Sequence, residues 1–122
     1  QMAVAALTPP SIRPKNAASA LSSTDLTTVY TCPSTFTAHI KEVWVTNVDG
    51  TSAADITLKW TDSSASATFD LVSTASVSAD NYLRFSEANI FLEAGDAFKA
   101  QASAANDLTV SVFIEEQIRP AG

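Results

Sequence analysis

Two carboxylates near the carboxyl end, Glu93 and Asp96, enclose Ala94 and Gly95 in the stretch EAGD. Paired acids about 5 to 10 Å apart can hydrolyse glycosides, and roughly six to eight grouped oxygens can bind calcium. With thirteen acidic residues in the chain, some pair of carboxylates falls within the glycosidase distance by chance. No D-x-D-x-D loop is present to group the acidic residues as calcium ligands. We therefore interpret EAGD as a corner, in which Gly95 supplies the reversal and Asp96 accepts a backbone N–H. This corner and the Asp49 hairpin stay open as places for calcium, but no metal site is predicted.

The other residues of catalytic type are too few or too isolated to form a site. His39 is the only histidine, so a Ser-His-Asp triad or an imidazole metal centre would depend on it alone. Cys32 is the only cysteine, which excludes an internal disulfide and a thiolate zinc site, and we expect it to be a small buried side chain. No serine lies in a G-x-S-x-G turn. These observations predict no catalytic residues and no cofactor, and therefore no enzyme.

The charge balance excludes several classes of partner. Thirteen acidic residues against seven basic ones leave a formal net charge of -6 in 122 residues. Such a chain repels phosphate backbones and anionic lipids, so no direct nucleic-acid partner is predicted. No apolar run approaches the roughly 20 residues that span a bilayer, and MAVAAL near the start is short and lacks the basic residues of a signal peptide. We expect one soluble domain with no membrane partner.

Period-two alternation of apolar and polar residues runs through the body of the chain. In DITLKWTD, Ile56, Leu58 and Trp60 share one face, and in ATFDLV we expect Phe69 and Leu71 to point inward. About eight such strands, separated by turns roughly every 8 to 12 residues, predict an all-β fold. The predicted architecture is a single antiparallel β-sandwich of the jelly-roll kind with extended N- and C-terminal arms.

The two ends of the chain differ from this body. Residues 1–23 contain three prolines and few large apolar side chains, and proline lacks the N–H that a strand ladder needs. We therefore predict an extended N-terminal arm over residues 1–23, a β-sandwich over 24–116 and a C-terminal tail over 117–122. Two alternatives remain for the arms: they lie along their own domain, or neighbouring subunits hold them.

Aromatic side chains that are out of phase with the core suggest contact surfaces. Trp60 shares its face with Ile56 and is expected in the core, whereas Trp44 falls on the face opposite Val43. Phe113 is also out of phase with its neighbours. An apolar ring on an outer face is a candidate subunit contact, and flat rings can also stack on sugars. Together with positions in the arms, these rings make up the predicted partner contacts, which are Pro9, Pro10, Ile12, Arg13, Trp44, Phe113, Ile118 and Arg119.

Three stretches carry a distinctive order of motifs: VYTCPSTFTAHIKEVWVTN, ADITLKWTDSSASATFDL and FLEAGDAFKAQASAANDLTVSVFIEE. A strand that ends in C-P precedes an I-x-x-V-x-V-x-N strand, and a late L-E-A-G-D turn leads to an alanine-rich hairpin and a final V-S-V strand. This order resembles the small β-sandwich structural proteins of tailed-bacteriophage virions. The resemblance covers roughly Val29 to Glu116, and its motifs are architectural, with no catalytic signature.

The resemblance implies a non-enzymatic virion component and leaves its place open. One alternative is a capsid decoration (cement) protein that binds the outer shell and bridges neighbouring subunits of the major capsid protein. A neck, tail or fibre-attachment protein that contacts other virion proteins is the second, and a carbohydrate-binding β-sandwich module is the third. Exposed Phe113 and open edge strands also favour self-association, most simply as a trimer. We therefore expect the protein in the virion, on the outer surface of the capsid or in the neck or tail.

Overall fold

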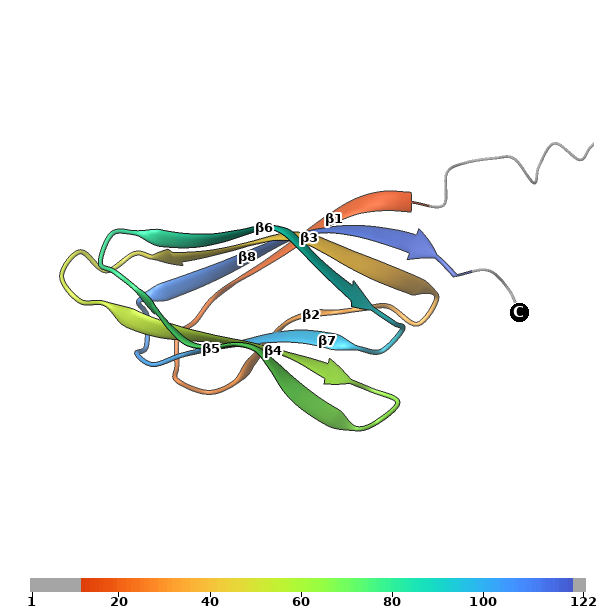
Figure 1. Ribbon diagram of the computed structural model, residues 1–122, viewed down its shortest axis with the longest axis horizontal. Coiled ribbons are helices and arrows are strands. Elements are labelled where there is room, and N and C mark those ends of the chain that lie inside the picture. Colours follow the sequence, from red (N-terminus) through yellow and green to blue (C-terminus); the bar gives the residue numbers. More distant parts are fainter. Residues whose placement is uncertain (1–11, 120–122) are drawn as a thin grey trace, which may run out of the picture.

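The computed structural model describes residues 12–119, which fold into eight β-strands. Two four-stranded antiparallel sheets, ordered β1-β8-β3-β6 and β2-β7-β4-β5, lie one above the other (Figure 1). This arrangement confirms the predicted β-sandwich. Within the described residues, no helix is long and apolar enough to cross a membrane. The strands are β1 (Ile12–Ala20), β2 (Thr27–Thr31), β3 (Phe36–Asn47), β4 (Ala54–Asp62), β5 (Ala67–Val77), β6 (Tyr82–Leu92), β7 (Ala97–Ala102) and β8 (Leu108–Ile118).

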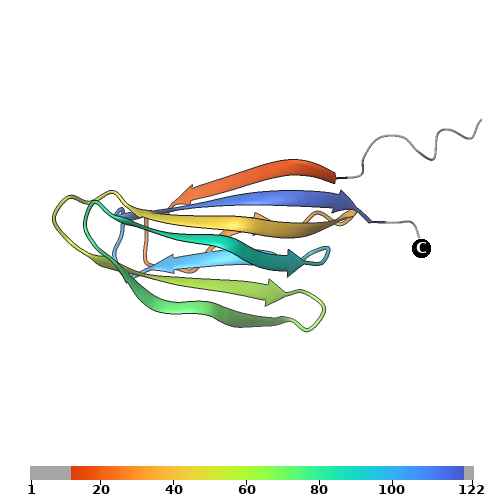
Figure 2. The same cartoon turned by 45° about the horizontal axis from the view of Figure 1, so that its top comes forward.

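The strand order is that of a jelly roll. The antiparallel pairs nest along the chain: β4 pairs with β5, β3 with β6, β2 with β7 and β1 with β8. Apart from the β4-to-β5 hairpin, each connection between these strands crosses from one sheet to the other. Figure 2 shows β1, β8, β3 and β6 side by side, with β1 at one edge of the sheet and β6 at the other. The first and last strands therefore close the roll together.

The core lies between the two sheets, where inward-facing side chains alternate with outward-facing ones. Ile40, Val43 and Val45 of β3 are buried, and they face the buried Ile56 and Leu58 of β4. Removing this apolar area from water is the main favourable term in the folding of such a sandwich. The largest fully buried apolar side chains are Phe98, Leu21, Ile40, Ile56, Leu92 and Leu108.

The burial predicted for individual side chains is partly correct. Cys32 is buried as expected, and burial raises the pKa of its thiol. Trp60 is half-buried and packs against the core. Phe69 and Leu71, which are expected to point inward, lie beside Trp60 and Val43 respectively, but they are 48% and 41% exposed. Both lie on β5, which is an end strand of its sheet and is therefore covered on one side only.

Strand β1 lies within the segment that the sequence predicts to be an arm. It pairs with β8 from Ile12 opposite Gln117 to Ala20 opposite Thr109, and an edge strand tolerates its proline. The predicted tail likewise begins inside β8, which ends at Ile118. In this part of the chain the arms therefore lie along their own domain. Residues 1–11 and 120–122, with Pro9 and Pro10, lie outside the described residues, so the division at residue 23 stays a prediction.

A buried carboxylate fastens β1 to the rest of the sandwich. Glu116 of β8 is 0% exposed, and its Oε1 accepts a hydrogen bond from Nε of Arg13 at 2.8 Å. Its Oε2 accepts a hydrogen bond from the hydroxyl of Tyr30 in β2. Burial raises the pKa of Glu116, but the hydrogen bonds from Tyr30 and Arg13 outweigh it and leave the pKa below its usual value. One carboxylate thus links β1, β8 and β2, which belong to both sheets.

The substitution Glu116→Gln should lower the free energy of unfolding at pH 7 by about 2 to 3 kcal/mol, because the charge-assisted bond to Arg13 is lost. Since the pKa of Glu116 is lower in the folded protein, the unfolded chain takes up the proton first on acidification. This contribution is therefore complete above the ordinary glutamate pKa of about 4.3, and it is lost as the pH falls from there through the folded value. Urea unfolding between pH 7 and pH 3 measures both effects, and the variant should lack this part of the pH dependence.

The neighbouring substitution Glu115→Gln is the matched control. Glu115 is half exposed and pairs with exposed Lys41 at 3.4 Å, so its loss should cost less than about 1 kcal/mol. An equal loss of stability in the two variants would contradict the role assigned to Glu116.

Candidate interaction surface

The outer face of the sheet β1-β8-β3-β6 carries a row of aromatic rings. The strand register places five of them on this side, and we call the surface the aromatic face. Phe91 is 70% exposed, and Tyr82 and Phe113 are also exposed, whereas the other two are half-buried. Large exposed apolar side chains grouped on one face make that face a candidate contact site. The five rings are those of His39, Trp44, Tyr82, Phe91 and Phe113.

Trp44 is held rigidly by its neighbours on the aromatic face. The Tyr82 ring stacks on it at 5.2 Å between centroids, and the guanidinium carbon of Arg84 lies 5.2 Å from its ring centroid. The indole N–H donates a hydrogen bond to the Glu42 carboxylate, which also binds Nη2 of Arg84 at 2.8 Å. The bonds from Arg84 and then Trp44 hold the pKa of Glu42 below its usual value. These contacts fix the orientation of the indole ring.

A second aromatic pair lies at the other end of this face. The rings of His39 and Phe91 stack with 4.4 Å between centroids, and Nε2 of His39 lies 2.8 Å from Oδ1 of Asn89. Asn89 belongs to a bulge of β6 in which it and Glu87 have φ angles of 51° and 55°. Non-glycine residues rarely adopt such positive φ angles, because they are energetically unfavourable. The bulge that contains them places Asn89 against the histidine. His39 is thus part of a stacked surface pair.

Two hollows make the aromatic face uneven. The first has a volume of about 350 Å³ and the second about 420 Å³. Projecting rings beside hollows favour partners whose side chains can interlock with the surface. The first hollow lies among Ile12, Thr37, His39, Phe91, Glu115 and Gln117. The second lies among Glu42, Trp44, Thr46, Ser111 and Phe113.

The outer face of the other sheet is different in chemistry. Its register turns short hydroxyl, amide and charged side chains outward, and Lys59 pairs with Asp70 across two strands at 3.2 Å. Such a face is well hydrated and offers little apolar area to a partner. The outward residues include Thr28, Asp55, Thr57, Lys59, Thr68, Asp70, Lys99 and Gln101.

The structure brings some of the predicted contact residues together and separates others. Ile12, Trp44 and Phe113 lie on the aromatic face. Arg13 instead points toward buried Glu116, although its side chain is 55% exposed. The exposed Ile118 and Arg119 lie at the end of β8, where the Arg119 backbone N–H donates to the carbonyl of Thr35. Pro9 and Pro10 lie outside the described residues. The contact role of all eight residues stays a prediction.

Sequence reasoning missed several members of the aromatic face. Tyr82, Arg84 and Phe91 were not among the predicted contacts, although Tyr82 and Arg84 alternate with Leu83 in a clear period of two. Phe91 is harder to assign, because the bulge at residues 87–89 shifts the phase of β6. The alternation could have indicated the first two residues, whereas the third depends on the bulge.

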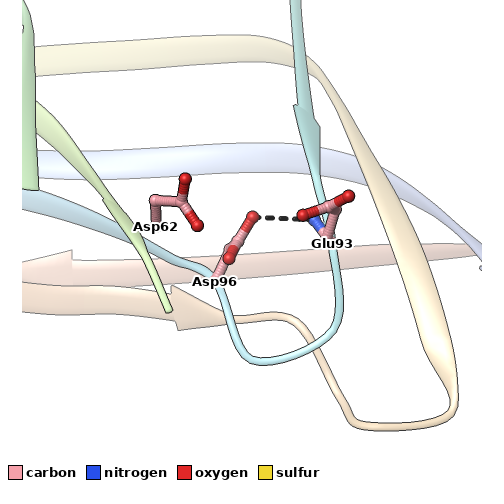
Figure 3. A group of neighbouring side chains, drawn as sticks. All are labelled: Asp62, Glu93 and Asp96. Atoms are coloured by element: carbon pink, nitrogen blue, oxygen red, sulfur yellow. Dashed lines mark hydrogen bonds between the residues drawn. The ribbon is translucent and has the colours of Figure 1, made fainter. Parts of the chain in front are cut away.

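The EAGD corner does bring carboxylates together. Asp62, Glu93 and Asp96 each place one oxygen within 4.8 Å of the others. Figure 3 shows these three side chains close together at the corner. Asp96 is buried, and its oxygens accept the backbone N–H of Ser63 at 3.0 Å and that of Glu93 at 2.9 Å. These bonds form the predicted corner, and Gly95 reverses the chain with φ of 88°. Because backbone donors already engage Asp96, the cluster is explained as a turn.

The fold, but not the sequence, has known relatives. No protein-family model and no curated protein matches the chain. The acid-stable capsid structure of Helicobacter pylori bacteriophage KHP30 contains a similar chain, with 11% identity, a TM-score of 0.53 and coverage of 88% of this chain and 87% of that one. The structure of Bacillus endospore appendages, which form disulfide-linked pili, has 12% identity, a TM-score of 0.55 and coverage of 98% and 99%.

A xylan-binding domain from Paenibacillus barcinonensis has 11% identity and a TM-score of 0.40, with coverage of 75% of this chain and 60% of that one. This last score is too low to bear on function. At these identities the other two similarities establish the sandwich fold alone, and chains of this fold include a viral capsid protein and a pilus protein.

The substitution Gly95→Ala should lower the free energy of unfolding by about 1 to 2 kcal/mol, because a side chain disfavours the positive φ at this corner. The added Cβ would also lie 3.0 Å from Oγ of Ser63. Gly50→Ala is the control, since its Cβ would meet Asp80 at an ordinary 3.4 Å and should change stability by less than about 0.5 kcal/mol. Chemical denaturation measures both, and similar effects would argue against the strained corner.

Proposed function

We propose that the protein is a non-enzymatic structural component of a tailed-bacteriophage virion, and that it decorates the outside of the capsid. In this role the aromatic face binds neighbouring subunits of the major capsid protein and bridges them. The observation that carries the proposal is the contrast between the two outer faces, one with exposed rings and one with hydroxyl and charged groups. The order of sequence motifs and the fold similarity to a phage capsid chain support it.

The composition of the aromatic face suits protein recognition. Tryptophan, tyrosine and arginine are the residue types most enriched among those that dominate binding energy, and Trp44, Tyr82 and Arg84 pack together here. Because Glu42 already holds both Trp44 and Arg84, little side-chain freedom remains to be lost on binding. A partner therefore meets a rigid surface.

Bridging also explains how a small domain could hold a large shell. One face of this size covers about 800 Å² per partner, which gives modest affinity for a single contact. Several copies joined as a trimer would bind together, and the effective concentration of the second and third contacts would raise the overall affinity. The acidic chain would stay on the outside, away from packaged nucleic acid, which it repels.

A subunit of a neck, tail or fibre is the second candidate. Rings and filaments require each copy to contact neighbours through two different surfaces. Phe69 and Leu71 on β5 form a second exposed apolar region that is separate from the aromatic face. The fold similarity to the Bacillus appendage protein, which forms pili, is compatible with such an assembly.

Removal of an aromatic anchor should weaken docking without unfolding the protein. Trp44→Ala and Phe113→Ser should each weaken binding to undecorated capsid shells by roughly 30-fold, as expected for a residue worth about 2 kcal/mol. Co-sedimentation with the shells measures the loss, and circular dichroism checks the fold. Lys99→Ala on the polar outer face is the control and should bind as the wild type does.

The position of the protein on intact particles separates the candidates. Labelling over the whole capsid is expected, whereas a single label at the neck or tail would favour the second candidate. A glycan-array signal that disappears in Trp44→Ala would instead indicate carbohydrate binding.

Sedimentation equilibrium of the purified protein should show a trimer. A monomer at micromolar concentration would count against a trimer that forms before assembly on the shell.

A further inference from the structure

An apolar groove lies between the two sheets at the edge formed by β5 and β6. Its volume is about 210 Å³, and its lining consists only of aliphatic and aromatic side chains. Val43 and Leu58 form its base and belong to the buried core, whereas Leu71 on its rim is exposed. An exposed apolar side chain therefore lies directly beside buried core residues along this seam. The remaining lining residues are Val72, Phe85, Ala88 and Ile90.

The strands beside the groove are not suited to pairing with another sheet. β5 and β6 are end strands, but each contains a bulge where residues have positive φ: Thr74 in β5, and Glu87 and Asn89 in β6. Bulges interrupt the regular ladder of backbone donors and acceptors, which protects an edge against sheet extension. A partner in this groove must therefore be held mainly by its side chains.

The chain itself contains a segment of matching chemistry. Residues 2–7 read MAVAAL, and no residue from 1 to 11 carries a charge. In an extended conformation Met2 and Val4 point to one side and Leu7 to the other, so both sides are apolar. Segments of this kind are typical of strands covered on both faces, and a segment between two sheet edges is covered in that way. Its neutrality also avoids repulsion from an acidic protein.

Geometry favours the groove of a second copy over the chain's own. β1 begins at Ile12, at the edge of its sheet opposite to β6. Fully extended, the five residue steps from Leu7 to Ile12 span at most about 18 Å. The three strand spacings from β1 to β6 already take up about 14 Å. Residues 2–7 would thus reach their own groove only along a nearly straight path across the sheet, and Pro9 and Pro10 restrict such a path further. A neighbouring copy imposes no such limit.

We propose that residues 2–7 of one copy occupy the apolar groove between β5 and β6 of a second copy. The contact links copies of this chain to one another through a surface distinct from the aromatic face. It does not depend on the capsid role, because it requires no other protein. In a symmetric assembly each copy would donate one segment and accept one, which closes a ring without extending either sheet.

Cysteine cross-linking of full-length protein tests this contact. One set of variants carries Ala3→Cys, Ala5→Cys or Leu7→Cys, and a differently tagged partner carries Leu71→Cys in the groove. After mixing and mild oxidation, at least one pair should give a disulfide-linked heterodimer on a non-reducing gel, confirmed by mass spectrometry. The native Cys32 is buried and should not react. Ser76→Cys is the matched control outside the groove. Ser76 is exposed on the same strand as Leu71 but faces away from the core, so its cysteine should cross-link poorly.

A charge in the segment should disrupt the contact. Val4→Asp, added to the cross-linking variants, should lower the yield by at least about tenfold, because an unpaired carboxylate would enter the apolar groove. Thr8→Asp adds the same charge just outside the segment and should leave the yield unchanged.

Equal yields at Leu71→Cys and Ser76→Cys, or no effect of Val4→Asp, would overturn the proposal. A variant with both cysteines in one chain that gives only an intrachain disulfide would overturn the choice of a second copy. Loss of shell binding in Trp44→Ala tests the proposed function separately.

Discussion

One buried carboxylate joins the two sheets at the place where this sandwich closes. Glu116 accepts bonds from Arg13 of β1 and Tyr30 of β2 while it lies in β8, so it joins the outermost pair of the roll to the opposite sheet. A buried charge is costly unless it is paired, and leaving it without Arg13 would be worse than never having buried it. The strand β1, which contributes little to the core, is held by its backbone ladder with β8, and this penalty adds to that hold.

The position of β1 has consequences for the surface that we interpret as functional. With β1 paired to β8, the small outward side chains Ala18 and Ala20 lie beside Ser111 and Thr109 at one edge of the aromatic face. At the other edge, β5 and β6 leave an apolar seam between the sheets. The aromatic face is thus the outer side of its sheet, whereas the groove lies between the two sheets.

The residues that could have carried chemistry serve the architecture instead. Asp96 is buried and binds two backbone N–H groups, and Cys32 is a small buried side chain whose thiol lies 3.3 Å from the carbonyl oxygen of Phe36. His39 stacks on Phe91 at the surface. In each case the local contacts account for the residue, because a buried polar group must find a partner and an exposed ring gains from stacking. Contact surfaces are therefore the natural place to look for function.

The sequence by itself determined the all-β class and the outward position of Trp44 and Phe113, because these follow from period-two alternation within single strands. Only the tertiary structure decided the features that depend on neighbouring strands. Residues 12–20 have weak strand preference and become β1 through pairing with β8 and the Arg13 bond to Glu116. The bulge at Lys41 turns Ile40 inward against simple alternation, and the end position of β5 exposes Phe69 and Leu71. Bulges and sheet edges arise from contacts between segments distant along the chain, so no local pattern encodes them.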